Sequence, residues 1–295
     1  MSTKIIIGSR GSDLALWQAY HVKAQLENLN CEVEIKIIKT QGDQIQHLSF
    51  DKMEGKGFFT KEIEAALLDR SIDLAVHSHK DLETTSPAGL VVAAVSDREN
   101  PTDILLVRKE SVDPTAPYKV KNGAIIGTSS ARRRTQLFRL LGEIEVQDLR
   151  GNVPTRIQKL RDGQYDAIVL AHAGVLRLNI NLSEFEVVEF DPTAFVPCPA
   201  QGVLALQIRE NDAHLMEILA HLNSDSVKKR IHVERKILNL LDGGCQLPLG
   251  AYCPNEKEVF VSFTQNNNAA SELYRFPFPK DENEIQHIVN AIKKH

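Results

Sequence analysis

A strand, a turn and the beginning of a helix follow one another in the stretch Ile5-Ile6-Ile7-Gly8-Ser9-Arg10-Gly11-Ser12. Three consecutive branched apolar residues predict a buried strand, and apolar positions at helical spacing over 14–26 predict an amphipathic helix behind the turn. The same unit recurs at Ala124-Ile125-Ile126-Gly127-Thr128-Ser129-Ser130, with a helical pattern that continues to Leu141. A strand followed by a helix, repeated in this way, predicts an α/β fold made of two similar domains.

Each half also contains a second helix that leads into a second strand. The pairs are 61–68 followed by 73–77 in the first half, and 155–160 followed by 166–170 in the second half. Because the spacing differs between the halves, the likeness is one of architecture and not a strict sequence repeat.

The last third of the chain has a different pattern. Ser224 is placed to cap a helix that runs to Leu241, and two strand patterns, 259–263 and 273–278, precede an amphipathic terminal helix. These elements predict a small α+β domain at the C-terminal end.

The composition is that of an ordinary globular protein. The 295 residues are 42% hydrophobic and 25% charged, and no apolar run is long enough for a membrane span or a secretory signal. The four cysteines form no CxxC pair and no zinc-ligand spacing, so we expect reduced thiols and no metal. These features predict a cytoplasmic protein that does not enter a membrane.

Positive charge is concentrated in residues 121–180, although the chain as a whole has a formal charge of -4. That segment has ten lysines and arginines against five acidic residues. A basic segment in an acidic chain favours a compact anionic ligand over a long polyanion, and the interleaved aromatic residues of a nucleic-acid surface are absent. For several of the arginines, a solvated helix face remains the alternative.

Both strand-to-helix turns are suited to hold a carboxylate or a phosphate. A Gly/Ser/Thr turn that opens a helix directs backbone N–H groups and hydroxyls to one place, at the positive end of the helix dipole. Neither turn matches GxxxxGK[ST] or GxGxxG, so a nucleotide site has little support. A simple N-cap by Ser12 or Ser130 is the alternative, but Arg132 and Arg133 after the second turn favour a ligand with several carboxylates.

Asp81 closes the segment His77-Ser78-His79-Lys80-Asp81 at the end of a predicted strand, where α/β proteins place their working loops. A carboxylate near several arginines stays ionised, which suits it to stabilise a transient cation or to hold N–H groups. A surface salt bridge with Lys80 or with an arginine is the alternative.

Cys245 follows Gly243 and Gly244, where a helical pattern stops and a strand pattern begins. The glycines have no side chains to shield the sulfur and permit backbone angles that other residues avoid. A buried core cysteine is the alternative. The C-terminal end of a helix carries a partial negative charge, which disfavours a thiolate. We therefore expect Cys245 to be a permanent attachment point for a strong electrophile rather than a nucleophile that turns over.

The chain resembles the hydroxymethylbilane synthase family, also called the porphobilinogen deaminase family, over nearly its full length. The resemblance rests on Ser9-Arg10-Gly11-Ser12 with Leu14-Ala15-Leu16-Trp17-Gln18-Ala19, Gly55-Lys56-Gly57-Phe58-Phe59-Thr60-Lys61-Glu62, Ala75-Val76-His77-Ser78-His79-Lys80-Asp81, Gly127-Thr128-Ser129-Ser130-Ala131-Arg132-Arg133, Leu149-Arg150-Gly151-Asn152-Val153, Gln201-Gly202 and Gly243-Gly244-Cys245-Gln246. One such motif gives weak support, but seven in order along one chain are specific.

The resemblance implies a transferase of porphyrin, heme and other tetrapyrrole biosynthesis. It condenses four porphobilinogen molecules head to tail with release of ammonia, and then hydrolyses the linear product, hydroxymethylbilane, from the protein. The family carries a dipyrromethane primer on a thioether to the cysteine that matches Cys245. We expect a monomer that passes its product to a cyclising synthase.

The resemblance also implies which residues form the site. Asp81 is expected to be the catalytic carboxylate that stabilises the azafulvenium cation left when porphobilinogen loses ammonia. The residues expected to hold the primer, besides Cys245, are Lys80, Asp81, Thr128, Ser129, Arg132, Arg133 and Arg156. The residues expected to meet the substrate and the growing chain are Arg10, Ser12, Lys56, Arg150, Arg156 and Arg177. Lys56 belongs to a stretch, 46–57, that is expected to form a flap over a cleft.

The expected architecture is two α/β domains of the periplasmic-binding-protein type that flank a cleft, with a small α+β C-terminal domain. The first domain takes residues 1–100 and 199–220, the second takes 101–198, and the third takes 221–295 and carries Cys245. The chain departs from the family pattern at His79, Glu83 and Ala200, which leaves the local loop geometry open.

Two other functions remain as alternatives. One is a non-catalytic protein that binds small anions on the paired-domain plan of periplasmic solute receptors, which need no Gly-Gly-Cys and usually have a signal peptide. The other is a regulator that binds nucleic acid through residues 121–180.

Overall fold

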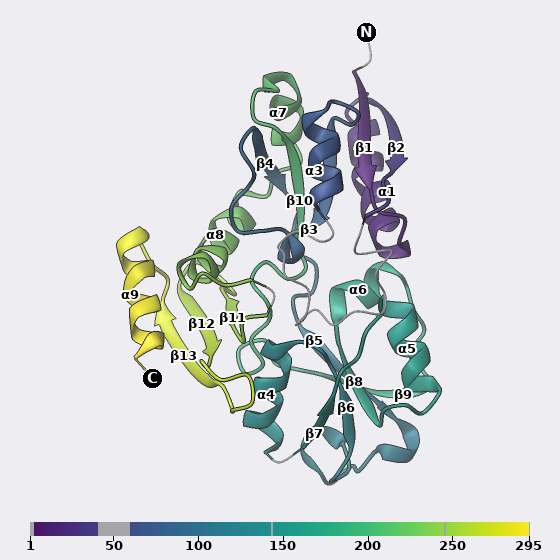
Figure 1. Cartoon of the computed structure of the whole chain (residues 1–295), viewed down its shortest axis with the longest axis vertical. Coiled ribbons are helices and arrows are strands. Elements are labelled where there is room, and N and C mark those ends of the chain that lie inside the picture. Colours follow the sequence, from purple (N-terminus) through teal and green to yellow (C-terminus); the bar gives the residue numbers. More distant parts are fainter. Residues whose placement is uncertain (1–2, 41–59, 143, 245, 295) are drawn as a thin grey trace. The chain divides into compact units, whose positions relative to one another are not determined.

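The computed structural model of the chain describes residues 3–40, 60–142, 144–244 and 246–294 (Figure 1). Two compact units divide the chain: Met1–Glu99 with Gly202–Lys229, and Asn100–Gln201 with Arg230–His295. We call them unit 1 and unit 2. Each unit is therefore made from two separate segments of the sequence.

Unit 1 is a five-stranded sheet with helices packed against it. Its elements are β1 (Lys4–Ser9), α1 (Asp13–Glu27), β2 (Glu32–Ile37), α3 (Lys61–Leu68), β3 (Leu74–Ser78), β4 (Leu90–Val95), β10 (Leu204–Arg209) and α7 (Ala213–Ala220). The strand order is β2-β1-β3-β10-β4. β1 pairs with β2 and β3 in parallel, whereas β10 runs antiparallel to both of its neighbours.

The first predicted strand and helix form as expected. Ile5 and Ile7 of β1 are buried, and α1 covers them with Val22 and Leu26. Burying side chains of this size contributes roughly 1.5–3 kcal/mol each. The carboxyl end of β1 is close-packed, because a Cβ on Gly8 would lie 2.3 Å from Cδ1 of Ile72.

Unit 2 repeats the sheet of unit 1. Its elements in this part of the chain are β5 (Asp103–Arg108), β6 (Ile125–Gly127), α4 (Ala131–Leu141), β7 (Glu145–Gln147), α5 (Val153–Arg161), β8 (Ala167–Ala171), α6 (His172–Arg177) and β9 (Phe185–Glu189). The strand order is β7-β6-β8-β5-β9, with β6 parallel to β7 and β8, and β5 antiparallel to β8 and β9. β5 thus takes the position that β10 has in unit 1.

In each unit an equivalent carboxylate ties one strand to the segment before its parallel neighbour, β1 to the residue before β3 and β6 to the residue before β8. Asp73 accepts a hydrogen bond from the backbone N–H of Ile6 at 3.0 Å, and Asp166 accepts one from Ile125 at 2.9 Å. The prediction of two similar α/β domains is confirmed by this shared topology.

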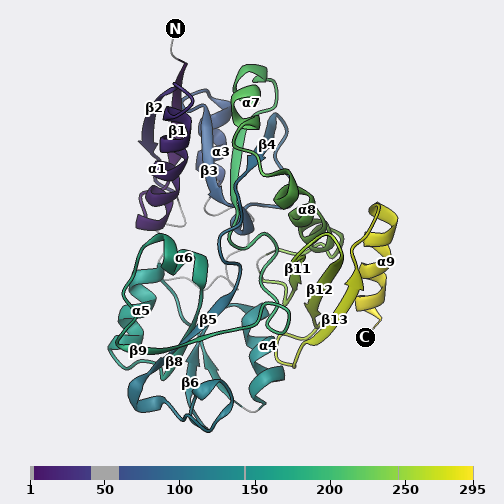
Figure 2. The ribbon, with the colours of Figure 1, turned by 180° about the vertical axis from the view of Figure 1, so that it is seen from behind.

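The C-terminal part is an antiparallel sheet with two helices. The strands β11 (Gly250–Tyr252), β12 (Glu258–Phe263) and β13 (Glu272–Pro277) lie beside α8 (Asp225–Leu240) and α9 (Glu282–Lys293), as Figures 1 and 2 show. Ile237, Val259 and Val289 meet in their common core. The predicted α+β composition is confirmed, whereas the separate third domain over 221–295 stays a prediction.

A buried carboxylate joins this C-terminal part to the rest of unit 2. Glu234 of α8 is fully buried, and its two oxygens accept hydrogen bonds from the backbone N–H groups of Ala200 and Cys253, both at 2.8 Å. Ala200 has φ of +59°, a left-handed conformation that an L residue rarely adopts. A glycine would adopt this conformation without steric cost.

Replacing Ala200 by glycine should stabilise the protein. The left-handed conformation costs alanine roughly 1–2 kcal/mol, and the extra freedom of a glycine in the unfolded chain offsets about 0.5–1 kcal/mol of that. We expect Ala200→Gly to raise the free energy of unfolding by up to about 1 kcal/mol, measured by urea unfolding. Ala205→Gly, in the middle of β10, is the control and should lower it. A loss of stability in Ala200→Gly would contradict the argument.

Candidate functional site

The site residues predicted in unit 1 lie beyond the carboxyl ends of two adjacent strands. Arg10 and Ser12 follow β1, and Lys80 and Asp81 follow β3, which pairs with β1 in parallel. Neighbouring parallel strands end at the same edge of a sheet, which is where α/β proteins bind their ligands. Unit 1 therefore brings these four residues to one edge.

Asp81 ends a single 3₁₀ turn, His79–Asp81, directly after β3. Its side chain is exposed and makes no ion pair with any side chain in the described part of the chain, so the alternative of a surface salt bridge receives no support. The turn is held at its start: Gln18 donates to the Ser78 hydroxyl at 2.7 Å, and the His79 N–H donates to the carbonyl of Val203. The carboxylate is thus held in place by its backbone and left open to a ligand.

A buried polar chain supports the same strand end. The Nε2 atom of His77 lies 3.0 Å from Oε1 of Gln207, and Gln207 donates to the Glu64 carboxylate at 3.0 Å. Burial lowers the pKa of His77 to about 4, and the hydrogen bond with Gln207 opposes this only in part. His77 is therefore neutral at physiological pH.

The site residues predicted in unit 2 also follow adjacent parallel strands. Thr128, Ser129, Arg132 and Arg133 follow β6, Arg150 and Arg156 follow β7, and Arg177 follows β8 at the end of α6. In the sheet, β6 lies between β7 and β8. The predicted site residues of the basic segment thus follow strands that end at one edge of one sheet.

The turn that opens α4 is rigid. The Ser130 side chain accepts a hydrogen bond from the backbone N–H of Arg133, as the predicted N-cap does. The Thr128 hydroxyl accepts one from the N–H of Ser130, and the Ser129 hydroxyl donates to the carbonyl of Leu149. Ser12 caps α1 in the same way through the N–H of Ala15. The N-cap interpretation is therefore right for both serines, and it leaves the arginines as the charged groups of the turn in unit 2.

Arg132 and Arg133 are buried and share one carboxylate that sequence reasoning missed. Asp103 accepts hydrogen bonds from Nη1 of Arg132 and Nη2 of Arg133, both at 2.7 Å. Burial by itself would raise the pKa of Asp103, but the two guanidinium groups lower that pKa well below its ordinary value. The available signal was an acid at the start of the apolar run Ile104-Leu105-Leu106-Val107.

The other three arginines predicted for the site in unit 2, Arg150, Arg156 and Arg177, differ in how deeply they are buried. Arg156 donates from Nε to the carbonyl of Gly151 at 2.7 Å, and the carbonyl of Arg150 accepts from Lys159 at 3.1 Å. Arg150 and Arg156 are half-buried, whereas Arg177 is buried. The guanidinium groups of this edge therefore span a range of depths, as a ligand with several carboxylates requires.

The end of α8, just before Cys245, differs in detail from the expectation. The residue in the left-handed conformation is Asp242, with φ of +52°, and neither Gly243 nor Gly244 has a positive φ. The N–H of Asp242 donates to Asn239 and that of Gly243 to Leu238, the paired bonds of a Schellman motif.

The two glycines of this segment have different surroundings. A Cβ on Gly243 would lie 2.6 Å from a Leu247 methyl, whereas a Cβ on Gly244 would meet nothing within 4 Å. Gly243 is thus required by packing, and the space that the sequence argument expected lies at Gly244. Cys245, Lys56 and the whole of the predicted flap over 46–57 lie outside the described residues.

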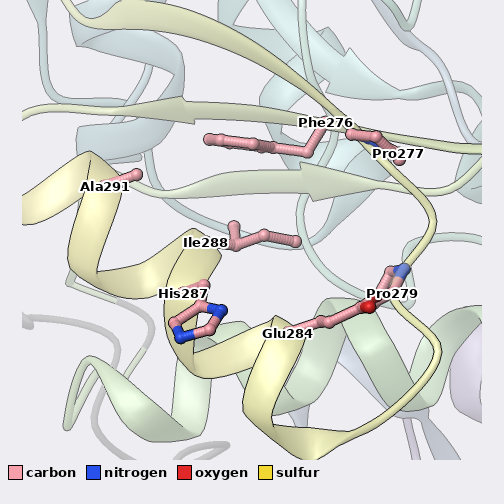
Figure 3. Close-up of a pocket in the computed structure, with 7 residues that line it drawn as sticks. All are labelled: Phe276, Pro277, Pro279, Glu284, His287, Ile288 and Ala291. Atoms are coloured by element: carbon pink, nitrogen blue, oxygen red, sulfur yellow. The ribbon is translucent and has the colours of Figure 1, made fainter.

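A separate apolar pocket of about 310 Å³ lies between β13 and α9, lined among others by Phe276, Ile288 and Ala291 (Figure 3). It contains none of the predicted site residues. Within the described ranges, no group of three or more His, Cys, Asp or Glu side chains is arranged to hold a metal ion. No helix in the described part of the chain is long and apolar enough to cross a membrane.

Comparison with known proteins gives consistent matches. The family model described as "Porphobilinogen deaminase, dipyromethane cofactor binding domain" matches residues 5–217. The chain is 45% identical over 252 residues to porphobilinogen deaminase of Nitratidesulfovibrio vulgaris (strain DP4), an alignment that covers 84% of this chain and 78% of that protein. It is 44% identical over 265 residues to porphobilinogen deaminase of a Nitratiruptor species, covering 90% and 81%.

Among solved structures, an ancestral arginine-binding protein bound to arginine aligns with 75% of this chain and 91% of its own length. The TM-score is 0.41 and the sequence identity is 17%.

The buried neutral His77 should make the protein less stable in mild acid. The unfolded chain binds a proton at this residue below about pH 6.5, whereas the folded chain binds it only below about pH 4. Stability is therefore lost as the pH falls between these values. From pH 7 to pH 5, we expect wild type to lose about 2 kcal/mol more than His77→Gln, measured by urea unfolding at both pH values. Equal losses in the two proteins would contradict this.

Proposed function

Because the chain belongs to the porphobilinogen deaminase family, we propose that Asp81 and the basic residues at the carboxyl edges of the two sheets perform the family's reaction here. The enzyme is a transferase that joins four porphobilinogen molecules head to tail with release of ammonia, and then releases linear hydroxymethylbilane. Its cofactor is a dipyrromethane. The alternative of a non-catalytic anion receptor is not favoured, because the matched relatives are deaminases.

One observation supports the proposed site above all others. The thirteen distinct positions expected from sequence include Lys56 and Cys245, which lie outside the described residues. Every other expected residue follows β1, β3, β6, β7 or β8, and within each unit these strands are parallel neighbours. Such a gathering of side chains from distant parts of the sequence is typical of a ligand site in an α/β protein.

The charges of unit 2 suit a cofactor whose pyrrole rings each bring an acetate and a propionate. A guanidinium has five N–H donors, and the hydrogen bonds that Arg132 makes to Asp103 and to Val196 both leave from Nη1. Arg133 donates three, two to Asp103 and one to the carbonyl of Val169. Both arginines therefore keep N–H donors for carboxylates of the cofactor.

We assign the remaining contacts from the resemblance of the chain to the family. Lys80, Thr128, Ser129 and Arg156 would hold further carboxylates of the cofactor, and Cys245 would hold it by a thioether. Arg10, Ser12, Lys56, Arg150, Arg156 and Arg177 would hold the acetate and propionate groups of the incoming substrate and the growing chain. When bound, the cofactor supplies the electron-rich pyrrole carbon at which elongation begins.

Asp81 is proposed as the catalytic carboxylate. When the C–N bond of the protonated aminomethyl group of porphobilinogen breaks, ammonia leaves with the electron pair of that bond, and the positive charge passes to the substrate's methylene and pyrrole ring. An exposed carboxylate with no ion pair among the described side chains can stabilise this charge and accept a hydrogen bond from the pyrrole N–H. The anchoring of its turn through Ser78 and His79 keeps the carboxylate in one position while successive substrates react.

Four further features belong to this proposal. They are the separate third domain over 221–295, a monomeric state, transfer of hydroxymethylbilane to a cyclising synthase, and a cytoplasmic location. The first is supported by the distinct antiparallel sheet β11-β12-β13 with its own core. Size-exclusion chromatography with light scattering tests the oligomeric state.

Replacing Cys245 should remove the cofactor. We expect intact-protein mass spectrometry to show the added mass of a dipyrromethane on the wild type and none on Cys245→Ala, because a thioether needs the sulfur. Cys31→Ala, a buried cysteine of unit 1, is the matched control and should keep the added mass. Wild type that comes unmodified and inactive from cells able to make porphobilinogen would refute the assignment.

Neutralising Asp81 should abolish most turnover without unfolding the protein. Asp81→Asn keeps the size of the exposed side chain but removes its charge, so we expect kcat to fall by about 100-fold or more with an unchanged circular dichroism spectrum. Asp69→Asn, an exposed carboxylate at the end of α3, is the control and should turn over normally. A rate for Asp81→Asn within threefold of wild type would remove Asp81 from the mechanism.

A further inference from the structure

The Asp103 carboxylate receives four N–H donors in a fully buried position. Arg132 Nη1 reaches Oδ2 at 2.7 Å, while Arg133 Nη2 and Nε reach Oδ1 at 2.7 and 3.2 Å. The side-chain amide of Gln201 adds a bond to Oδ1 at 3.2 Å and also donates to the carbonyl of Pro101. Asp103 is thus held from several directions and has little freedom to rotate.

The Asp103 carboxylate brings together two side chains that would otherwise point in different directions from their helix. Arg132 and Arg133 are consecutive residues of α4, and consecutive residues point about 100° apart around a helix. Their guanidinium groups nevertheless meet at Asp103, the first residue of β5. The shared carboxylate therefore fixes where both groups lie.

The cluster keeps one unbalanced positive charge. Asp103 contributes one negative charge against two positive ones, and the three side chains are only 0%, 5% and 6% exposed. Burial lowers the pKa of Arg133, and Asp103 counteracts this effect. The carbonyls of Val169 and Val196 accept hydrogen bonds from the pair but carry no net charge. A buried site with an excess positive charge is completed by an anion.

We propose that Asp103 is a positioning residue for the cofactor, one that fixes Arg132 and Arg133 in the arrangement that binds cofactor carboxylates and leaves one positive charge for them. The inference rests on the proposed binding role of the two arginines. Asp103 itself touches neither the cofactor nor the substrate in this role. Its effect should appear in how fully the cofactor is loaded and how well the loaded enzyme turns over.

The test compares Asp103→Asn and Asp103→Glu with wild type as purified full-length enzyme. Intact-protein mass spectrometry gives the fraction of molecules that carry the dipyrromethane, and kcat and KM for porphobilinogen are measured per loaded molecule. We expect Asp103→Asn to load less completely and to lose at least tenfold in kcat. KM should stay within threefold, because other arginines are assigned to the incoming substrate.

Asp103→Glu keeps the charge but moves it by one methylene group. We expect this variant to fold and to load, with kcat several-fold below wild type. It decides the question if Asp103→Asn does not fold. Asp166→Asn is the matched control: this carboxylate of the same unit pairs with Lys121 and binds the backbone of Ile125, away from the arginine pair. We expect it to lose stability, with loading and kcat unchanged.

The proposal fails if either Asp103 variant folds, loads fully and turns over within twofold of wild type. It also fails if Asp166→Asn lowers loading and kcat as much as Asp103→Asn, because the effect would then follow stability alone. Failure of the proposed function looks different, since wild type itself would then carry no cofactor. Normal loading in both Arg132→Gln and Arg133→Gln would remove the arginines from the site and the proposal with them.

Discussion

Each of the two mixed sheets contains one strand that runs antiparallel to both of its neighbours. β10 comes after the first segment of unit 2 and lies between β3 and β4, while β5 comes after the first segment of unit 1 and lies between β8 and β9. Only β10 is separated in the sequence from the other strands of its sheet, so the sheet of unit 1 is complete only when the chain returns after Gln201. The rest of the structure depends on β10 and β5, because each is hydrogen-bonded on both sides and connects the outermost strand, β4 or β9, to the remainder of its sheet.

The chain passes from one unit to the other after Glu99 and returns after Gln201, and buried polar groups lie beside both of these crossing segments. Gln201, just before the chain returns to β10, donates to the carbonyl of Pro101, just before β5, and to the Asp103 carboxylate. Glu234 binds the backbone of Ala200 on the same returning segment. A buried polar group without a hydrogen-bond partner lowers the stability of a folded protein by several kcal/mol. The crossing segments are therefore held by hydrogen bonds to one another. The arginine pair of the proposed cofactor site is built on this framework.

The chemistry of the family explains why the proposed site contains many basic side chains. Every pyrrole unit adds carboxylates, and the basic residues that follow β6, β7 and β8 offer guanidinium groups at several depths. The capping serines Ser12 and Ser130 accept hydrogen bonds from the backbone of their own helices, and the arginines supply the positive charge of the turn in unit 2. Asp81 stands apart as an exposed carboxylate beyond β3, where its charge is available to a cation.

The sequence by itself determined the local elements, the α/β and α+β composition, and the motifs that led to the family. These follow from hydrophobic periodicity, glycine turns and capping residues, which act over a few neighbours and can be recognised in the chain. Tertiary structure alone decided that β10 runs antiparallel between β3 and β4, that Asp103 binds both Arg132 and Arg133, and that Asp242 rather than a glycine ends α8 in the left-handed conformation. Contacts between residues about 30 to 140 positions apart leave no periodic trace, because the free energy of burying and pairing a charge depends on which distant groups surround it.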